Sequence, residues 1–159
     1  MIRPVTVADY SALCEIYNYY IEHTTVTFDI EKLSIADVQT KLERNWKYPC
    51  VVCEQDGVIV GFAAASEWKA KKAYQQTVEL SVYLRPDSYK NGYGSSLYSE
   101  LIDILRSQGI HSIISGIIMP NHQSIALHDK FRFKKVAHFS EVGYKFDKWF
   151  DVTYWQLML

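Results

Sequence analysis

Residues 77–84 alternate strictly between polar and apolar side chains, with Val78 on the apolar side of the pattern and Glu79 on the polar side. A period of two residues predicts a strand. Pro86 ends this pattern, because proline has no N–H to donate to a sheet. Over residues 97–105 the apolar side chains recur at helical spacing, which predicts an amphipathic helix.

Two glycines, Gly92 and Gly94, lie where the loop after this strand enters the helix. The first N–H groups of a helix have no partner within the helix, and the helix dipole favours negative charge at that end. Glycine lets a ligand approach the backbone closely, so the sequence predicts a phosphate or pyrophosphate site. Two other phosphate motifs are excluded. No lysine follows Gly94, as a P-loop requires, and Leu97 stands where a Rossmann fingerprint needs a glycine.

The rest of the chain predicts the order β-α-α-β-β-β-α-β-α-β-β. Patterns typical of capping boxes at residues 6–9 and 34–37 predict the starts of the first two helices. The apolar stripe of the second helix contains Val38, Leu42 and Trp46. We therefore expect this helix to pack through these three side chains.

The dipeptide at residues 56–57, Asp-Gly, predicts a hairpin turn between two strands. The remaining predicted elements are strands at 2–5, 50–54, 58–65, 111–118, 133–142 and 152–158, a helix at 123–130, and a connection at 143–151. No repeat or low-complexity segment interrupts this order, so we expect one domain over residues 1–159.

Composition is that of a globular protein, with 159 residues of which 48% are hydrophobic. The 17 basic and 18 acidic residues nearly cancel, and no basic stripe indicates nucleic-acid binding. The sequence has no secretory signal and no apolar run of about 20 residues, which would be needed to cross a membrane. These features predict a soluble, cytoplasmic protein that does not bind membranes.

Three cysteines have two interpretations. Cys50 and Cys53 have the spacing of a metal-ligand pair, but the sequence contains no second pair. Residues i and i+3 of a strand point to opposite faces of the sheet. This favours ordinary buried thiols, and no metal is expected.

Residues 89–94, Tyr-Lys-Asn-Gly-Tyr-Gly, resemble the Q/R-x-x-G-x-G/A motif of the GNAT N-acetyltransferases, in which the preceding strand binds the pantetheine arm of acetyl-CoA. The resemblance covers the whole chain and is closer to the phosphinothricin and methionine sulfone/sulfoximine N-acetyltransferase branch. The matching segments are 16–18, 24–28, 77–79, 81–83, Asn121, 124–128, 142–143, 145–146, Trp149 and Asp151. The resemblance implies an α/β (α+β) fold with a mixed, mostly antiparallel sheet of six or seven strands flanked by four helices.

The resemblance also implies acetyl-CoA as the cosubstrate. A splayed strand would offer its backbone at residues 82–84 to the pantetheine arm and leave one N–H free for the thioester carbonyl. The implied cofactor-binding residues are Val82, Tyr83, Leu84, Lys90, Asn91, Gly92, Tyr93, Gly94, Ser95, Asn121 and Lys130. Other interpretations stay open for three of them, because Asn121 can cap a helix and Lys90 and Lys130 can be solvated surface lysines.

Acetyl transfer to an amine requires a base for the amine, a donor for the oxyanion and an acid for the leaving thiolate. Glu79, a carboxylate among apolar neighbours, is the candidate base, acting directly or through a water. Its alternative is a charge-paired structural role. His128 stands where many GNAT proteins have a tyrosine as the acid, and a histidine can supply that proton near neutral pH. Its alternative is a packed histidine.

An amino-acid acceptor has a carboxylate, which the cationic, aromatic loop before residue 77 is suited to hold. The candidate substrate-binding residues are Phe28, Lys69, Lys71, Lys72 and Tyr74. The resembling enzymes carry arginines where Lys69 and Lys71 stand, and lysine does not make the planar bidentate contact of arginine. A solvated loop is the alternative.

These residues predict an acetyl-CoA-dependent N-acetyltransferase for the α-amine of a small amino-acid-like substrate, by direct transfer in a ternary complex. The rivals are an acetyltransferase for a peptide N-terminus or a polyamine, and a non-catalytic acyl-CoA sensor. Two departures from the family pattern keep the sensor open: Tyr89 replaces Gln or Arg, and Arg132 replaces a helix-ending glycine. The resemblance further implies a homodimer.

Overall fold

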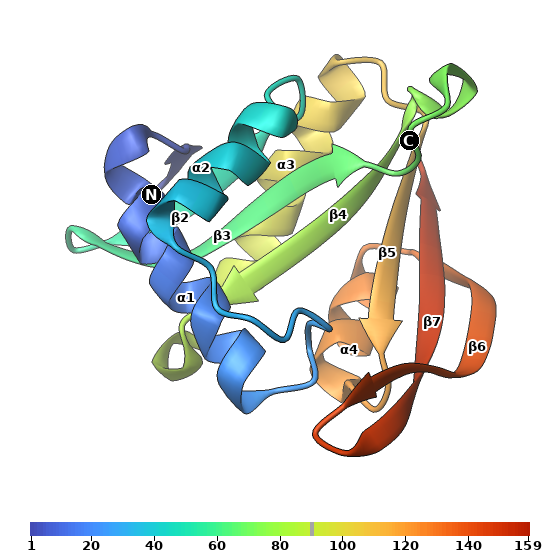
Figure 1. The fold of residues 1–159 in the computed structure, drawn as a ribbon. Coiled ribbons are helices and arrows are strands. Elements are labelled where there is room, and N and C mark those ends of the chain that lie inside the picture. The colour runs from blue at the N-terminus through green and yellow to red at the C-terminus, as the bar shows by residue number, and fades with distance from the viewer. Residues whose placement is uncertain (90) are drawn as a thin grey trace.

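A seven-stranded sheet runs through the molecule in the computed structural model, which describes residues 1–89 and 91–159 (Figure 1). The strands are β1 (Ile2–Pro4), β2 (Cys50–Gln55), β3 (Val58–Glu67), β4 (Thr77–Leu84), β5 (Ser112–Ile118), β6 (Lys134–Lys145) and β7 (Lys148–Met158). Their order is β1-β2-β3-β4-β5-β7-β6, and only β4 and β5 pair in parallel. The predicted mixed, mostly antiparallel sheet is confirmed.

The described residues form four α-helices, α1 (Tyr10–His23), α2 (Ile35–Arg44), α3 (Tyr93–Ser107) and α4 (His122–Lys130). The predicted starts of the first two are confirmed. Before α2, Ser34 and Asp37 each accept a hydrogen bond from the other's backbone N–H, at 3.2 and 2.8 Å. Before α1, the carboxylate of Asp9 accepts the N–H of Thr6 at 2.8 Å. These bonds satisfy N–H groups that a helix start would otherwise leave unpaired.

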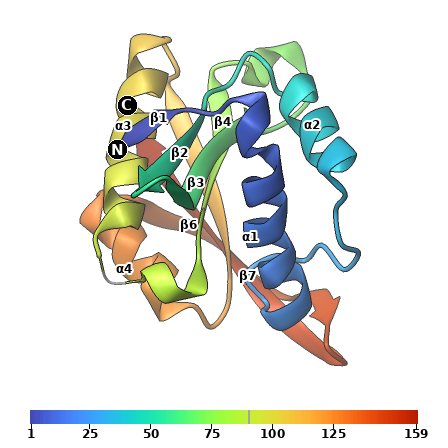
Figure 2. The same ribbon diagram turned by 90° about the vertical axis from the view of Figure 1, so that its left-hand side faces the viewer.

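The helices cover the sheet from both sides, with α1 and α2 on one face and α3 and α4 on the other (Figure 2). The face under α3 packs Leu97, Leu101 and Leu105 against Val78 and Leu80 of β4. The opposite face packs apolar residues of α1 against β2 and β3. The alternation of β4 therefore sends its even-numbered side chains toward α3 and its odd-numbered side chains, Glu79 included, toward the face of α1 and α2.

Strands β4 and β5 part in the middle of the sheet. They pair only from Thr77↔Ser112 to Glu79↔Ile114, although β4 runs on to Leu84 and β5 to Ile118. Past this point the two strands diverge, with α4 lying near the opening (Figure 1). The separation leaves one edge of β4 without a strand partner in the middle of the molecule.

Two expectations are corrected. The predicted connection at residues 143–151 is mostly strand, because β6 and β7 pair as far as Lys145↔Lys148 and leave only a turn at Phe146 and Asp147. Trp46 is not part of the apolar stripe of α2, since that helix ends at Arg44 and the Trp46 side chain is 82% exposed. A helical period extrapolated past the true helix end placed it wrongly.

Helix α4 ends with a non-glycine residue in the left-handed region. Arg132 has φ of +63°, and the N–H of the next residue, Phe133, bonds the carbonyl of His128 at 3.0 Å. This is the backbone geometry of a helix end that usually contains glycine. The residue that replaces the family's helix-ending glycine therefore adopts a strained backbone conformation.

We predict that Arg132→Gly raises the free energy of unfolding by about 0.5–1 kcal/mol, because glycine adopts positive φ without steric cost. The melting temperature should rise by roughly 2–4 °C per kcal/mol in a chain of this length. Asp147→Gly is the matched comparison, because Asp147 also has positive φ, +58°, but lies in the hairpin turn and not at a helix end. A melting temperature unchanged or lowered in the first variant contradicts the strain.

Candidate active site

A groove of about 460 Å³ occupies the opening between β4 and α4. It is lined by Tyr20, Val26, Val82, Leu84, Tyr89, Gly92, Tyr93, Gly94, Ser95, Asn121, Gln123, Ser124, Ala126, Leu127 and Lys130. The lining is apolar along β4, mixed along α4, and made of glycine, tyrosine and serine at the start of α3. Such a groove suits a ligand with a long, mostly apolar arm and an anionic end.

The end of the groove that is suited to bind an anion is the N-terminus of α3. Gly92 precedes the helix with φ of +80°, and the first intrahelical bond, from Ser96 to Gly92 O, measures 3.0 Å. The N–H groups of Tyr93, Gly94 and Ser95 precede that bond and have no intrahelical acceptor. Among the residues that the structure describes, no side chain caps the helix start, and no acidic residue lies in its first turn. The site fits the pyrophosphate of a coenzyme.

The free edge of β4 supplies backbone donors to the same groove. Ser115 Oγ donates to Leu80 O at 3.0 Å, and Leu84 O accepts from Tyr20 at 2.6 Å, so both carbonyls point away from β3. Along a strand, residues two apart direct their N–H and C=O groups to the same edge. We infer that the N–H of Val82 points into the opening, where the carbonyl of a bound thioester can reach it.

Tyr89 has a structural role at the narrow end of the groove. Its hydroxyl bonds the hydroxyl of Tyr20, which also donates to Leu84 O and accepts Leu84 N–H at 3.3 Å. The departure from Gln or Arg thus ties the loop before α3 to α1 and to the end of β4. Sequence reasoning missed Tyr20, which belongs to the apolar face of α1 and gave no separate signal.

Two predicted residues make hydrogen bonds at helix ends beside the groove. Lys130 Nζ donates to Ser95 Oγ at 2.9 Å, which links the end of α4 to the start of α3. Asn121 Oδ1 accepts the N–H of Ser124 at 3.0 Å, so Asn121 caps α4 while its side chain also lines the groove. The capping interpretation of Asn121 is confirmed, and its cofactor role stays a prediction.

The structure brings together eight of the predicted cofactor residues, Val82, Leu84, Gly92, Tyr93, Gly94, Ser95, Asn121 and Lys130. Tyr83 sends its ring to the opposite face, against Tyr17 and Phe62 at 4.9 and 5.4 Å between centroids. Asn91 is exposed and does not line the groove. Lys90 lies outside the described residues.

Glu79 lies where β4 and β5 part. Partial burial raises the pKa of its carboxyl above the ordinary value of 4.5, with desolvation as the cause. Gly116 of β5 and Tyr154 of β7 are close by; a Cβ built on Gly116 would lie 3.8 Å from Glu79 Oε1. Within the described residues no cation pairs with Glu79, which disfavours the charge-paired alternative. A carboxylate in this state can accept a proton near neutral pH.

His128 is buried in the core at 2% exposure and does not line the groove. Nδ1 lies 2.7 Å from Ser124 O, so that nitrogen carries the proton and Nε2 accepts the hydroxyl of Tyr98 at 2.9 Å. Burial lowers the pKa of the ring. A neutral imidazole with both nitrogens engaged does not suit proton donation to a thiolate, so the geometry favours the packed histidine over the predicted acid.

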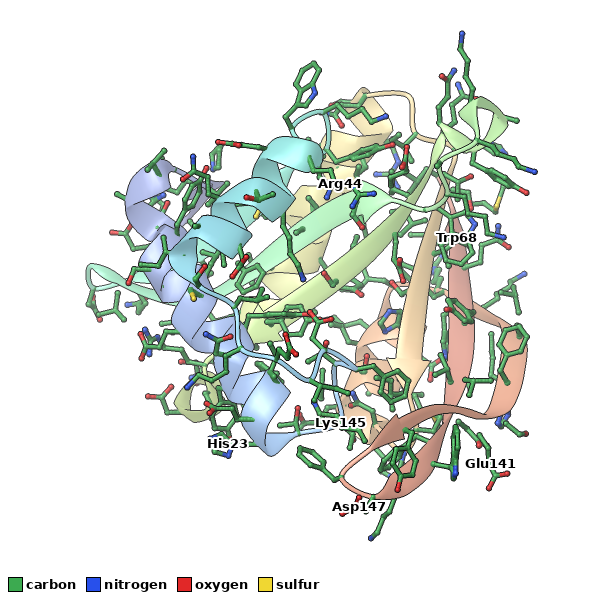
Figure 3. The ribbon with its side chains drawn as sticks, viewed as in Figure 1. His23, Arg44, Trp68, Glu141, Lys145 and Asp147 are labelled. Carbon is green, nitrogen blue, oxygen red and sulfur yellow. The ribbon has the colours of Figure 1, made fainter. Side chains whose placement is uncertain are left out.

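The predicted acceptor residues lie in two separate segments, the loop before β4 and the loop between α1 and α2. Lys69 Nζ is 5.5 Å from the ring centroids of both Trp68 and Tyr74, and Trp68 contacts Tyr154 at 5.6 Å. Through Trp68, which Figure 3 labels, the loop thus contacts Tyr154, a neighbour of Glu79. Lys71 and Lys72 are exposed.

Phe28 comes from the loop between α1 and α2 and packs on the hairpin of β6 and β7. A Cβ on Gly143 would lie 2.0 Å from the Phe28 ring, so only glycine fits there. Lys145, buried beside it, donates to Thr27 O at 2.8 Å (Figure 3). Phe28 therefore fixes the loop in place and does not line the groove.

Comparison with known proteins agrees with this geometry. The model of the acetyltransferase (GNAT) domain matches residues 2–154. The phosphinothricin N-acetyltransferase of Streptomyces viridochromogenes is 40% identical over 98% of this chain and 85% of that protein. The L-methionine sulfoximine/L-methionine sulfone acetyltransferase of Salmonella typhimurium is 36% identical, over 99% of this chain and 94% of its own length.

A solved structure gives the same result. The structure of yncA from Salmonella typhimurium with its cofactor acetyl-CoA superposes with a TM-score of 0.97 and 35% identity, covering 100% of this chain and 93% of that chain. In the present structure, no helix within the described residues is long and apolar enough to cross a membrane. The same residues contain no cluster of three side chains suited to hold a metal ion.

We predict that Gly92→Val weakens acetyl-CoA binding by at least roughly tenfold, because a side chain at this position obstructs approach to the helix N-terminus. Isothermal titration calorimetry measures the affinity. Gly57→Val is the matched control, since Gly57 also has positive φ, +78°, and open space around its Cβ position. Both variants carry the same backbone strain, and only the first should lose affinity. Equal affinities in the two folded variants would contradict the assignment.

Proposed function

We propose, for a chain that belongs to the GNAT acetyltransferase family, that it transfers the acetyl group of acetyl-CoA to the α-amine of a small amino acid analogue such as phosphinothricin, methionine sulfone or methionine sulfoximine. The observation that carries the proposal is the partly buried carboxylate of Glu79 at the opening between β4 and β5, next to a groove that ends at the N-terminus of α3. The names of the full-length relatives support the class of acceptor.

The residues divide the reaction between two faces of β4. On the α3 side, the helix N–H groups and Lys130 hold the coenzyme, which supplies an activated acetyl group when bound. The N–H of Val82 stabilises the oxyanion that forms during attack. On the other face, Glu79 removes the proton from the ammonium group of the acceptor, directly or through a water. The amine would then attack the thioester without a covalent acetyl-enzyme. The amide bond forms as the C–S bond breaks, and the coenzyme A thiolate leaves and takes the second proton released from the amine nitrogen.

The raised pKa of Glu79 means that its ionised carboxylate destabilises the folded protein. A carboxyl that binds its proton more tightly in the folded chain than in the unfolded chain destabilises the fold as the pH rises from about 4.5 through the folded-state pKa. At pH values above the folded-state pKa, the free energy of unfolding is lowered by the full amount. Retaining an unpaired carboxylate here fits a catalytic role better than a structural one.

We predict that Glu79→Gln lowers turnover by roughly 10²–10⁴-fold, the scale of general-base catalysis. Acetyl-CoA affinity should stay the same, and the melting temperature at pH 7 should equal or exceed that of the wild type. In the wild type, the rate should fall with decreasing pH through a pKa above 4.5, and this limb should be absent from the variant. A variant as fast as wild type at every pH would require another base.

We propose that Lys69 holds the α-carboxylate of the acceptor, because its ammonium is fixed by two aromatic rings on the loop that reaches Tyr154. A lysine binds a carboxylate through one compact charge and discriminates less than an arginine. Lys71 and Lys72 add positive charge around it. This charge disfavours a polyamine acceptor.

Converting the acceptor's α-carboxylate to an amide should raise KM by roughly tenfold in the wild type, the scale of one charge-assisted hydrogen bond. The double variant Lys69→Ala, Lys71→Ala should remove most of that difference when steady-state kinetics are compared. Equal kcat/KM for acid and amide in the wild type would move the assignment to peptide N-termini or other amines.

We also propose that the protein is a cytoplasmic homodimer. The hairpin of β6 and β7 presents apolar side chains that are 48–59% exposed, namely Val136, Phe139, Val142, Tyr144, Phe146 and Trp149. Such a patch on an edge strand is typical of an interface. The three cysteines are buried and free, as expected in a reducing compartment. Light scattering should give twice the chain mass of 18.5 kDa.

A further inference from the structure

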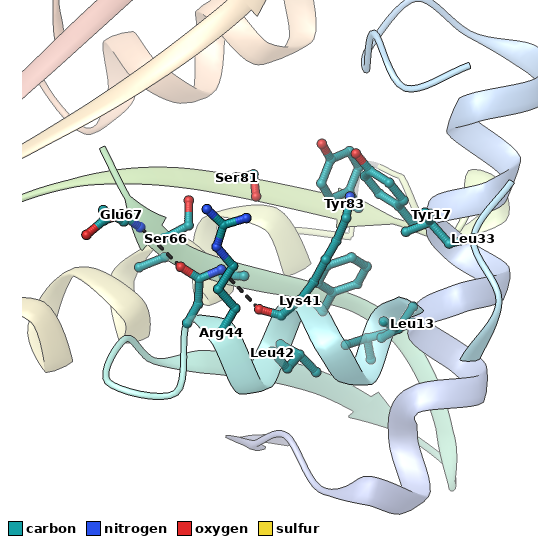
Figure 4. Close-up of a pocket in the computed structure, with 15 residues that line it drawn as sticks. Leu13, Tyr17, Leu33, Lys41, Leu42, Arg44, Ser66, Glu67, Ser81 and Tyr83 are labelled. Carbon is teal, nitrogen blue, oxygen red and sulfur yellow. Dashed lines mark hydrogen bonds between the residues drawn. The ribbon is translucent and has the colours of Figure 1, made fainter. Parts of the chain in front are cut away.

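A second cavity, of about 420 Å³, lies on the catalytic face of the sheet between α2, α1 and strands β3 and β4 (Figure 4). We propose that this cavity binds the side chain of the acceptor and that Arg44, with the hydroxyls of Ser66 and Ser81, recognises a negatively charged oxyanion at its end. The inference rests on the proposed function and narrows it to acceptors with an anionic side chain, such as a phosphinate or a second carboxylate.

The cavity adjoins the catalytic carboxylate. Ser66 of β3 is the cross-strand partner of Glu79, and Ser81 is two residues further along β4 on the same face. Directly paired residues of neighbouring strands have Cβ atoms about 5 Å apart, and residues two apart lie about 7 Å from each other. Both hydroxyls in the cavity wall are therefore one side-chain length from the proton acceptor. An acceptor whose amine meets Glu79 can extend its side chain into this space.

The positive charge available in the cavity belongs to Arg44. Lys41 also lines the wall, but its Nζ is bound to Asp29 at 3.0 Å. Glu67 at the rim lies 3.9 Å from Lys47. Within the described part of the chain, no carboxylate pairs with Arg44. Its guanidinium rises from the last turn of α2 toward the side of the cavity that holds Ser66 and Ser81 (Figure 4).

The end of α2 is anchored where the exposed side chain of Arg44 lines the mouth of the cavity. The next residue, Asn45, accepts the N–H of Glu67 at 3.3 Å and donates through Nδ2 to Lys41 O at 3.0 Å. These bonds attach the helix end to the end of β3, and Figure 4 draws both as dashed lines. The arginine backbone is thereby fixed against the sheet beside Ser66.

The chemistry of the wall selects the ligand. A guanidinium offers a planar fork of donors that matches two oxygens of a carboxylate or a phosphinate. Two hydroxyls can donate to the same oxygens. The opposite wall is apolar, formed by Leu13, Leu42 and Phe62 among others, and suits the methylene chain of an amino acid. A neutral sulfone fills the same volume but leaves the arginine charge uncompensated.

The test compares two acceptors that share the α-amine and the α-carboxylate, phosphinothricin with its anionic phosphinate and methionine sulfone with its neutral sulfone. We expect the wild type to prefer phosphinothricin in kcat/KM. Arg44→Gln should lower kcat/KM for phosphinothricin by roughly 10- to 100-fold, the scale of a lost charged hydrogen bond, and that for methionine sulfone by less than about threefold. Arg44→Lys should restore part of the loss.

Arg106→Gln is the matched control, because Arg106 is an exposed arginine in the last turn of α3, remote from the cavity. It should leave both acceptors unchanged. If Arg44→Gln affects neither acceptor, or lowers both equally, the oxyanion subsite is overturned; the equal loss would assign Arg44 to the α-carboxylate.

If the wild type acetylates neither acceptor, the proposed function fails separately. The subsite is then judged by calorimetry of phosphinothricin binding in the presence of coenzyme A. Tighter binding to wild type than to Arg44→Gln supports it, and binding that is absent or equal overturns it.

Discussion

The parting of β4 from β5 after the pair Glu79↔Ile114 is the constraint on which the rest of the molecule depends. A strand that loses its neighbour leaves backbone donors and acceptors that must find other partners. At Leu80 and Leu84 the partners are the hydroxyls of Ser115 and Tyr20. Between them, Val82 is left for a ligand. The same opening exposes the groove on one face and the carboxylate of Glu79, the proposed base, on the other.

The opening is kept in place by contacts from distant parts of the chain. The loop between α1 and α2 reaches the hairpin of β6 and β7, where Phe28 fits over Gly143 and the ammonium of Lys145 is bound to Thr27 O. Burial of a lysine lowers its pKa, and here the nearby Asp29 opposes that shift. These contacts connect elements on opposite sides of the opening, so the loop joins the two halves of the sheet where no strand pairing does. The cost of burying the charge supports a defined position for this loop.

The two faces of β4 differ in their electrostatics. The N-terminus of α3 collects positive potential without any acidic residue in its first turn, which suits a pyrophosphate. On the other face, Glu79 is partly desolvated and unpaired, while Asp29 is held by Lys41 and by the hydroxyl of Tyr17. Neutral, buried His128 contributes packing with Tyr98, Phe133 and Trp155. Of the carboxylates of Asp29 and Glu79, the first is paired with a cation and the second, within the described residues, is not.

The sequence by itself determined the order of the elements, the strand that carries Glu79 and the glycine-rich entry to α3. These features follow from local rules: side-chain periodicity, capping residues and the conformational freedom of Gly92 act over a few residues. The full-length resemblance supplied the family and the candidates for the base and the cofactor residues.

Only the tertiary structure decided how distant residues meet. It placed His128 in the core, joined Tyr89 to Tyr20, set Phe28 on Gly143 and brought Arg44 beside Ser66 and Ser81. A helical or strand period tells which face a residue occupies, but not which of two distant elements will cover that face. That choice depends on packing across the whole sheet, which no local pattern records.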